Sequence, residues 1–200
     1  MRPMNHLGTK TLENDRLLLR RFKLGDAQAM YDNWASDPEV TRYLTWQRHA
    51  DVKASKSIIK EWIPQYKNKD YYQWAIVLKD SGDMPIGSIG AEKADDQINA
   101  VSIGYCIGRK WWNRGITSEA LSLLIRFFFD EVHANRIESR HDPRNPNSGK
   151  VMEKCGLRYE GTRREGDRTN QGICDTKHYA ILAKDYRRDP QSEGEQNECD

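Results

Sequence analysis

The stretch RKWWNRGITS at 109–118 places three basic side chains and a glycine shortly before the apolar run LSLLIRFFF. The first turn of a helix has unpaired backbone N–H groups and the positive end of the helix dipole, which together favour a phosphate. Gly115 would let an anion approach the backbone closely, or would adopt a positive φ angle. The stretch therefore predicts an anion site at a helix start. A single glycine is a weak signal, and an ordinary turn with solvated basic residues is the alternative.

A second polar group lies downstream, in NPNSGKVMEKCGL at 145–157. Asn145 and Ser148 stand three residues apart at the start of an expected helix. Capping of that helix is the simple explanation for Asn145 or Asn147. It explains Ser148 less well, so the Ser148 hydroxyl is a candidate for chemistry.

The elements that position these groups follow from the apolar periodicity. It predicts a mixed α/β (α+β) sheet of six or seven strands flanked by helices. The expected strands are 16–22, 72–80, 85–94, 100–107, 134–141, 157–163 and 174–182, and the expected helices are 24–36, 51–66, 116–133 and 147–155.

The order of IGYCI, RKWWNRGITSEAL, NPNSGKVMEKCGL and RYEGTRR resembles the GNAT superfamily of acyl-CoA-dependent N-acetyltransferases. It is most similar to the RimJ/RimL type, which acetylates protein N-termini and related amines. The opening DRLLLRRFKLGDAQAMY fits the same type, so the resemblance runs from about residue 11 to residue 184. It implies a mostly antiparallel sheet splayed between its fourth and fifth strands, within a single acyltransferase domain at 1–188.

The resemblance also implies which residues bind acetyl-CoA. The diphosphate would rest on backbone amides of the loop at 112–117, the thioester carbonyl would meet a backbone N–H of the strand at 102–107, and Asn145 would contact the pantetheine arm. The implied cofactor-binding residues are Tyr105, Cys106, Ile107, Trp112, Asn113, Arg114, Gly115, Ile116, Thr117, Asn145 and Ser148.

The loop departs from the family pattern W-G-x-G-x-A at two positions. Asn113 replaces the first glycine, and Thr117 replaces the alanine. If the first position needs a positive φ angle, asparagine is the side chain that tolerates it best after glycine. The departure is therefore compatible with the expected loop.

Acetyl transfer needs a neutral amine, a positioned thioester, donors for the oxyanion and a proton for the departing thiolate. Many relatives take the proton from a tyrosine in the helix after Asn145, but that position is Met152 here. Resemblance to the RimL branch implies Ser148 instead, against the alternative that Ser148 only caps its helix.

Glu92 and Asp167 are the candidate general bases, with solvated surface carboxylates as the alternative reading of both. His141 is a further candidate base or substrate contact. An α-amino group has a pKa near 8, so about a tenth of it is neutral at pH 7 and a chain of water molecules could also accept its proton. We interpret Cys106 and Cys155 as small buried residues rather than nucleophiles.

A length of 200 residues suits one well-packed domain and is rather short for two. The segment 189–200, DPQSEGEQNECD, holds five acids and no base, so without it the formal charge changes from +2 to +7. We expect this segment to be disordered. The basic remainder would attract anions. The four cysteines have no metal-ligand or disulfide spacing, and no apolar run is long enough to cross a membrane.

These observations predict a cytoplasmic enzyme without a metal, a membrane partner or a nucleic-acid partner, and a homodimer is compatible with the resemblance. The predicted function is acetyl-CoA-dependent acetylation of a primary amine, with a protein N-terminus favoured. Two alternatives stay open: a polyamine or aminoglycoside acetyltransferase, and a non-catalytic module that only binds acyl-CoA.

Overall fold

A computed structural model describes residues 3–186, so the acidic segment 189–200 lies outside the described residues. Eight strands form one sheet in the order β1-β2-β3-β4-β5-β6-β8-β7. The strands are β1 (Leu12–Glu13), β2 (Leu17–Arg20), β3 (Gln73–Leu78), β4 (Pro85–Asp95), β5 (Ala100–Ile107), β6 (Arg136–His141), β7 (Arg158–Thr169) and β8 (Gly172–Leu182).

The mixed, mostly antiparallel sheet is confirmed, but the expected count of six or seven strands was too low. The additional strand is β1, whose two residues are too few to show any alternation in the sequence. Its turn into β2 is held by Asn14, whose side-chain oxygen accepts hydrogen bonds from the backbone N–H groups of Arg16 and Leu17.

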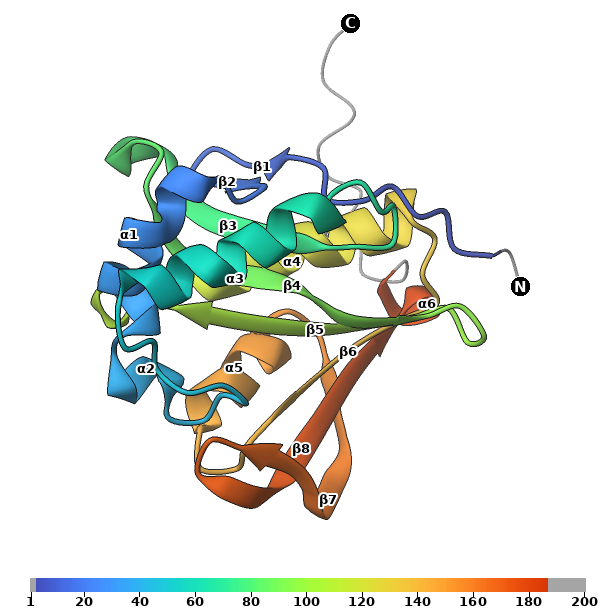
Figure 1. The fold of residues 1–200 in the computed structure, drawn as a ribbon. Helices are drawn as coiled ribbons and strands as arrows, with labels where there is room; N and C mark the ends of the chain where they lie inside the picture. Colours follow the sequence, from blue (N-terminus) through green and yellow to red (C-terminus); the bar gives the residue numbers. More distant parts are fainter. Residues whose placement is uncertain (1–2, 187–200) are drawn as a thin grey trace, which may run out of the picture.

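The sheet opens between β5 and β6, its one parallel pair. Ala100–Ser102 pair with Arg136–Glu138, and beyond this short ladder the two strands separate. Ser139 Oγ donates a hydrogen bond of 2.7 Å to the carbonyl of Ile103 at the point of separation. Figure 1 shows β6, β7 and β8 leaving the plane of the first five strands, which is the predicted splay.

Helices cover both faces of the sheet (Figure 1). The helices are α1 (Ala27–Met30), α2 (Pro38–Thr41), α3 (Val52–Gln65), α4 (Ile116–Arg126), α5 (Pro146–Lys154) and α6 (Ala183–Tyr186). Leu24–Asp26, Lys79–Ser81 and Arg109–Trp111 form 3-10 turns, while Tyr31–Ala35 and Phe127–Glu131 continue α1 and α4 as π-helical turns.

Two apolar clusters hold these layers together. The larger cluster packs α4 and its π-helical turn against one face of the sheet, with Trp74 and Phe128 fully buried. The smaller cluster joins the α1 region and α3 to the opposite face through Phe22, Trp34 and Ile59. Burial of these aromatic side chains fixes the α1 region over the sheet, where it forms a wall of the site described below.

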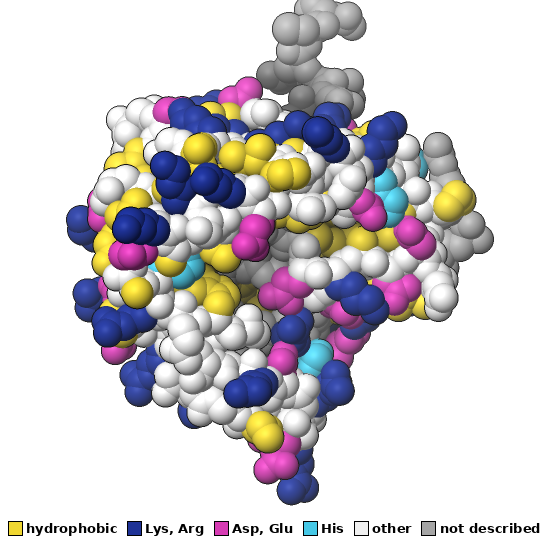
Figure 2. Space-filling model, in the orientation of Figure 1, with side chains coloured by type: hydrophobic (Ala, Val, Ile, Leu, Met, Phe, Trp, Pro, Cys, Tyr) yellow, Lys and Arg dark blue, Asp and Glu magenta, His cyan; other side chains and the backbone are white. Residues whose placement is uncertain are grey.

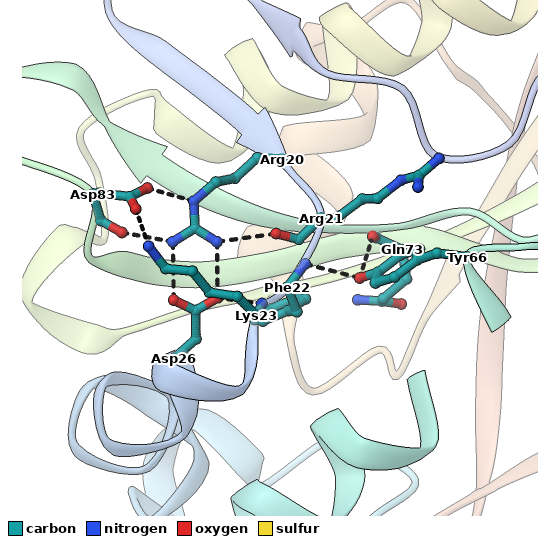
Figure 3. A network of polar contacts seen from close by, with 8 residues as sticks. All are labelled: Arg20, Arg21, Phe22, Lys23, Asp26, Tyr66, Gln73 and Asp83. Carbon is teal, nitrogen blue, oxygen red and sulfur yellow. Dashed lines mark hydrogen bonds and ion pairs between the residues drawn. The ribbon is translucent and has the colours of Figure 1, made fainter. Parts of the chain in front are cut away.

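An ion-pair network fixes the start of α1 (Figure 3). Arg20, at the end of β2, donates hydrogen bonds of 2.8 and 2.9 Å to the carboxylate of Asp26 and one of 2.5 Å to Asp83. Lys23 also contacts Asp83. The Asp26 side chain is 3% exposed, so Arg20 supplies most of the charge compensation that this buried carboxylate requires.

Candidate active site

The loop between β5 and α4 bends at two residues with positive φ angles. Asn113 has φ 60° and Gly115 has φ 75°. The sequence-based expectation that asparagine would replace a glycine at a positive φ is therefore confirmed. Gly115 is the residue before α4 and has no side chain that could cap the helix, so the N–H groups of the first turn face outward without a side-chain partner.

Two arginine side chains near this loop are held in ion pairs. Arg109 forms an ion pair of 3.0 Å with Asp37. Arg16 of the β1–β2 connection donates to the carbonyl of Arg114 at 3.1 Å and to Glu119 at 2.7 Å, which braces the loop against α4. Sequence reasoning missed Arg16, because it lies 98 residues from Arg114 along the chain.

All eleven residues predicted to bind the cofactor line one cavity of about 370 Å³ between this loop and α5. Lys150 and Lys154 of α5 also line it and add positive charge opposite the loop. Neither lysine was singled out in the sequence, although the two stand four residues apart and so share one face of the expected helix. The cavity combines a cationic end at the loop with a neutral end at Tyr105 and Asn145.

A second cavity, of about 380 Å³, lies on the other side of the opening between β5 and β6. One wall is apolar and aromatic, and the opposite wall carries polar groups of the sheet. The apolar wall includes Met30, Trp34, Trp46, Ile58 and Trp62, and the polar wall includes Ser88, Glu92, Arg140, His141, Asp142 and Asp167. Figure 2 shows this face hollowed between α3 and the β7–β8 hairpin, with Lys and Arg side chains gathered over α3.

The two cavities meet at the splay. Five residues line both of them: Leu44, Tyr105, Cys106, Asn145 and Ser148. A molecule that enters from the α4 loop and one that enters from the aromatic wall would therefore meet at these residues. This arrangement suits a reaction between two substrates.

The side chains of Asn145 and Ser148 are not used as helix caps. Asn145 precedes α5, but its side chain makes no capping hydrogen bond. Ser148 Oγ instead donates to the phenol oxygen of Tyr105 at 3.1 Å, and that phenol donates to the backbone carbonyl of Ser148 at 2.9 Å. Burial raises the pKa of Tyr105, and the hydrogen bond with Ser148 opposes that shift.

The two candidate bases lie at one guanidinium. Arg140 Nε donates to Asp167 at 2.5 Å, and Arg140 Nη1 donates to Glu92 at 2.7 Å. Burial works to raise the pKa of Asp167, but the hydrogen bond and charge of Arg140 outweigh it and the pKa is lowered. Glu92 reaches Arg140 across Gly104, where an added Cβ would lie 2.5 Å from the Glu92 carboxylate.

His141 is buried beside α5. Its Nδ1 is 2.8 Å from the Asp142 carbonyl, and its Nε2 has no hydrogen-bond partner within residues 3–186. A Cβ at Gly149 would lie 2.7 Å from that Nε2, so the backbone of α5 shields it. Burial lowers the pKa of His141, which keeps the imidazole neutral. A role of His141 as a base stays a prediction.

Cys106 lies at the junction but has the properties of a buried thiol. Its Sγ is 3.3 Å from Ser88 Oγ, and burial raises its pKa. Met152, at the position where many relatives have a tyrosine, is fully buried in the core. Neither residue therefore offers an acid or a nucleophile to the cavities.

A contact that the sequence did not indicate closes the second cavity. Asn170, in the turn between β7 and β8, donates through its side chain to the carbonyls of Thr41 and Trp46 at 2.7 and 3.0 Å. Its backbone N–H donates to the carbonyl of Leu44 at 2.8 Å. These three bonds hold the segment between α2 and α3 over the polar wall.

Within residues 3–186, no helix combines the length and apolar character needed to span a membrane. In the same range, no group of three or more His, Cys, Asp or Glu side chains is arranged to hold a metal ion.

Residues 16–158 match the family model of the acetyltransferase (GNAT) domain. The uncharacterized N-acetyltransferase p20 of Bacillus licheniformis is 30% identical over 177 residues, which cover 88% of this chain and 98% of the relative. The chain therefore belongs to the GNAT family and is RimJ/RimL-like. It is an acetyl-CoA-dependent N-acetyltransferase.

Two further proteins are similar to this chain. The [ribosomal protein uS5]-alanine N-acetyltransferase of Escherichia coli is 36% identical over 63 residues, which cover 32% of each chain. The crystal structure of the microcin C7 self immunity acetyltransferase MccE in complex with acetyl-CoA and AMP has a TM-score of 0.76 at 20% identity. That comparison covers 84% of this chain and 93% of the other.

Proposed function

We propose that this N-acetyltransferase transfers the acetyl group by direct attack of a primary amine on acetyl-CoA, with the N-terminal α-amine of a polypeptide as acceptor. The observation that carries the proposal is the meeting of the two cavities at Tyr105, Cys106, Asn145 and Ser148. One cavity suits the cofactor and the other suits the acceptor.

The residues of the first cavity fit acetyl-CoA. The uncapped N–H groups that follow Gly115 would hold the diphosphate, with Lys150 and Lys154 opposite. The side chain of Asn145, which makes no capping hydrogen bond, would bond the pantetheine arm, which carries amide groups. The thioester would then lie at the junction, beside Tyr105 and Ser148.

The direction in which the backbone groups of β5 point indicates which N–H would stabilise the oxyanion. The carbonyl of Ile103 accepts from Ser139 on β6, and the carbonyl of Ile107 accepts from Trp112 at 2.9 Å, so both point away from β4. The N–H and C=O of a strand residue point to one side and alternate along the strand. The N–H of Tyr105 therefore points into the opening, where it would donate to the developing oxyanion.

The paired carboxylates favour an α-amine over more basic amines. Arg140 binds both Glu92 and Asp167, so the two carboxylates already share one cation and the three side chains together carry a formal charge of only −1. A polyamine or lysine amine, with a pKa near 10.4, would need a stronger base or an anionic cleft. An α-amine with a pKa near 8 is already about one-tenth neutral at pH 7, so water or a weakly basic carboxylate is enough to accept its proton.

Similarity to the ribosomal-protein alanine N-acetyltransferase adds support for this acceptor, within the 63 residues that the two proteins share. The aromatic wall formed by Trp46, Ile58 and Trp62 would pack against an apolar first residue of the peptide.

Thiol release from acetyl-CoA tests the proposal. The purified protein is assayed with peptides that have free Ala, Ser, Thr or Met N-termini, with the same peptides blocked, with spermidine and with an aminoglycoside. We expect acceleration by free peptides and none by blocked peptides. Acceleration by spermidine or the aminoglycoside alone would contradict the proposed acceptor.

A further inference from the structure

The phenol of Tyr105 lies where the two cavities meet, and within residues 3–186 its hydrogen bonds are both with Ser148. It accepts a hydrogen bond of 3.1 Å from Ser148 Oγ and donates one of 2.9 Å to the Ser148 carbonyl. The role proposed above for Tyr105 uses its backbone alone. The two contacts give its side chain a position directly behind the hydroxyl that would face the thioester sulfur.

A serine hydroxyl is a poor proton donor by itself. Its alkoxide is far more basic than a thiolate, whereas a phenol has an ordinary pKa near 10. A hydroxyl can donate one proton while it accepts another, so Ser148 can pass a proton from Tyr105 onward. The 3.1 Å separation of the two oxygens allows that transfer by rotation of the hydroxyl hydrogens, with no movement of the oxygen atoms.

We propose that Tyr105 supplies, through Ser148, the proton that the departing thiolate of coenzyme A takes up. This inference rests on the proposed function, since it assigns the proton source for the same acetyl transfer. Tyr105 is then a positioning and relay residue, and Ser148 is the group that touches the sulfur.

The step balances as follows. The amine nitrogen forms a bond to the thioester carbon and gives its proton to solvent, and the C–S bond breaks with its electron pair left on sulfur. The Ser148 hydroxyl gives its proton to sulfur while the Tyr105 hydroxyl turns from the Ser148 carbonyl and gives its proton to Ser148 Oγ. Ser148 ends neutral, and the phenolate of Tyr105 regains a proton from water in the cavity.

Other groups near the junction do not fill this role. Met152 is fully buried and has no proton, and the shielded Nε2 of His141 faces α5. Burial, followed by the charges of Cys155 just after α5 and of Tyr179 on β8, raises the pKa of Tyr105, while Ser148 lowers it. The phenol therefore holds its proton at neutral pH.

Four variants test the relay: Tyr105→Phe, Ser148→Ala, the double variant, and Tyr179→Phe as a matched control. Tyr179 packs near the same helix, and its hydroxyl contacts Glu153 rather than Ser148. We expect each of the first two to lower kcat about a hundredfold while the KM for acetyl-CoA changes less than about threefold. The double variant should be no slower than Ser148→Ala, and Tyr179→Phe should match the wild type. Additive losses, or a Tyr105→Phe variant as fast as the wild type, would overturn the relay.

The acyl donor provides a readout that packing alone would not change. An aryl thioester releases a more acidic thiol, which leaves without a proton. The ratio of wild-type to Tyr105→Phe kcat/KM should therefore be about a hundredfold with acetyl-CoA and fall to about threefold with the aryl thioester. Equal ratios for the two donors would mean that Tyr105 only supports the structure.

A second substitution covers the case in which Tyr105→Phe does not fold. Placing 3,5-difluorotyrosine at position 105 keeps the hydroxyl and lowers its pKa, so the alkaline limb of kcat should move to lower pH. An unmoved limb would overturn the relay. The wild type separates the two proposals, because its turnover of free peptides tests the acceptor whatever the variants do.

Discussion

Arg140 on β6 and Asp167 on β7 are joined by a hydrogen bond of 2.5 Å. The same guanidinium reaches Glu92 on β4, so it connects the two halves of the sheet across the opening between β5 and β6. The acceptor cavity is therefore spanned by one cation and two carboxylates. We expect this charge balance, rather than any single acid, to decide which amine can enter.

Removal of the cation should change the choice of acceptor. In Arg140→Gln, two unpaired carboxylates would remain in the acceptor cavity and attract a polycation. We expect the ratio of kcat/KM for spermidine to that for a free peptide to rise about tenfold. Arg163→Gln, at an exposed position of β7, serves as the control. An unchanged ratio would show that the contacts of Arg140 with the two carboxylates only support the structure.

The acid stability of the protein should depend on Asp167. Its pKa is lowered by Arg140 against the opposing effect of burial, so the folded state holds the carboxylate more strongly ionised than the unfolded chain does. The stabilisation is present above the unfolded pKa of about 3.9 and is lost as the pH falls through the lower folded pKa.

The free energy of unfolding, measured from about pH 6 to about pH 3, should therefore fall more steeply for the wild type than for Asp167→Asn. Parallel curves for the two proteins would contradict this assignment of the Asp167 pKa.

The backbone of the cofactor loop should tolerate glycine at position 113 and reject a β-branched residue. Asn113 has φ 60°, which strains valine by about 1–2 kcal/mol. Calorimetric titration with coenzyme A should show Asn113→Val binding about tenfold more weakly than Asn113→Gly. Equal affinities for the two variants would mean that the loop does not need this conformation.

The network at Arg20 should contribute to stability rather than to chemistry. Arg20→Met leaves the buried carboxylate of Asp26 without its cation, and loss of one partner of a buried pair costs about 3–5 kcal/mol. Lys23→Met removes an exposed partner of Asp83 and should cost less than about 1 kcal/mol. Denaturant unfolding distinguishes the two, and similar losses would show that Asp26 does not depend on Arg20.

Asn170 should affect acceptor binding more strongly than cofactor binding. Asn170→Ala removes two of the three bonds that hold the segment at 41–46 over the acceptor cavity. The KM for a free peptide should rise about fivefold, while the affinity for coenzyme A stays within about twofold. Gln97→Ala, in the β4–β5 turn, is the control. A matching loss of coenzyme A affinity would contradict the assignment of this segment to the acceptor side.

The sequence alone determined the family, the course of seven strands and the loop that ends at Gly115. These features are local: they depend on apolar periodicity, on glycine or asparagine where φ is positive, and on the short-range order of RKWWNRGITS. Residues within one such stretch lie together whatever the rest of the chain does, so the loop before α4 and its positive φ at Asn113 could be predicted.

Only the tertiary structure decided which side chains share the site. Glu92, Arg140 and Asp167 come from three strands, and Asn170 meets Thr41 across 129 residues of chain. The sequence indicated only a backbone donor at Tyr105. The folded structure places Ser148 of α5 against the phenol of Tyr105. Such pairs depend on the splay of β5 and β6 and on the packing of α5. No local sequence pattern encodes these pairs, because each residue would have the same local sequence if its side chain lay on a solvated surface.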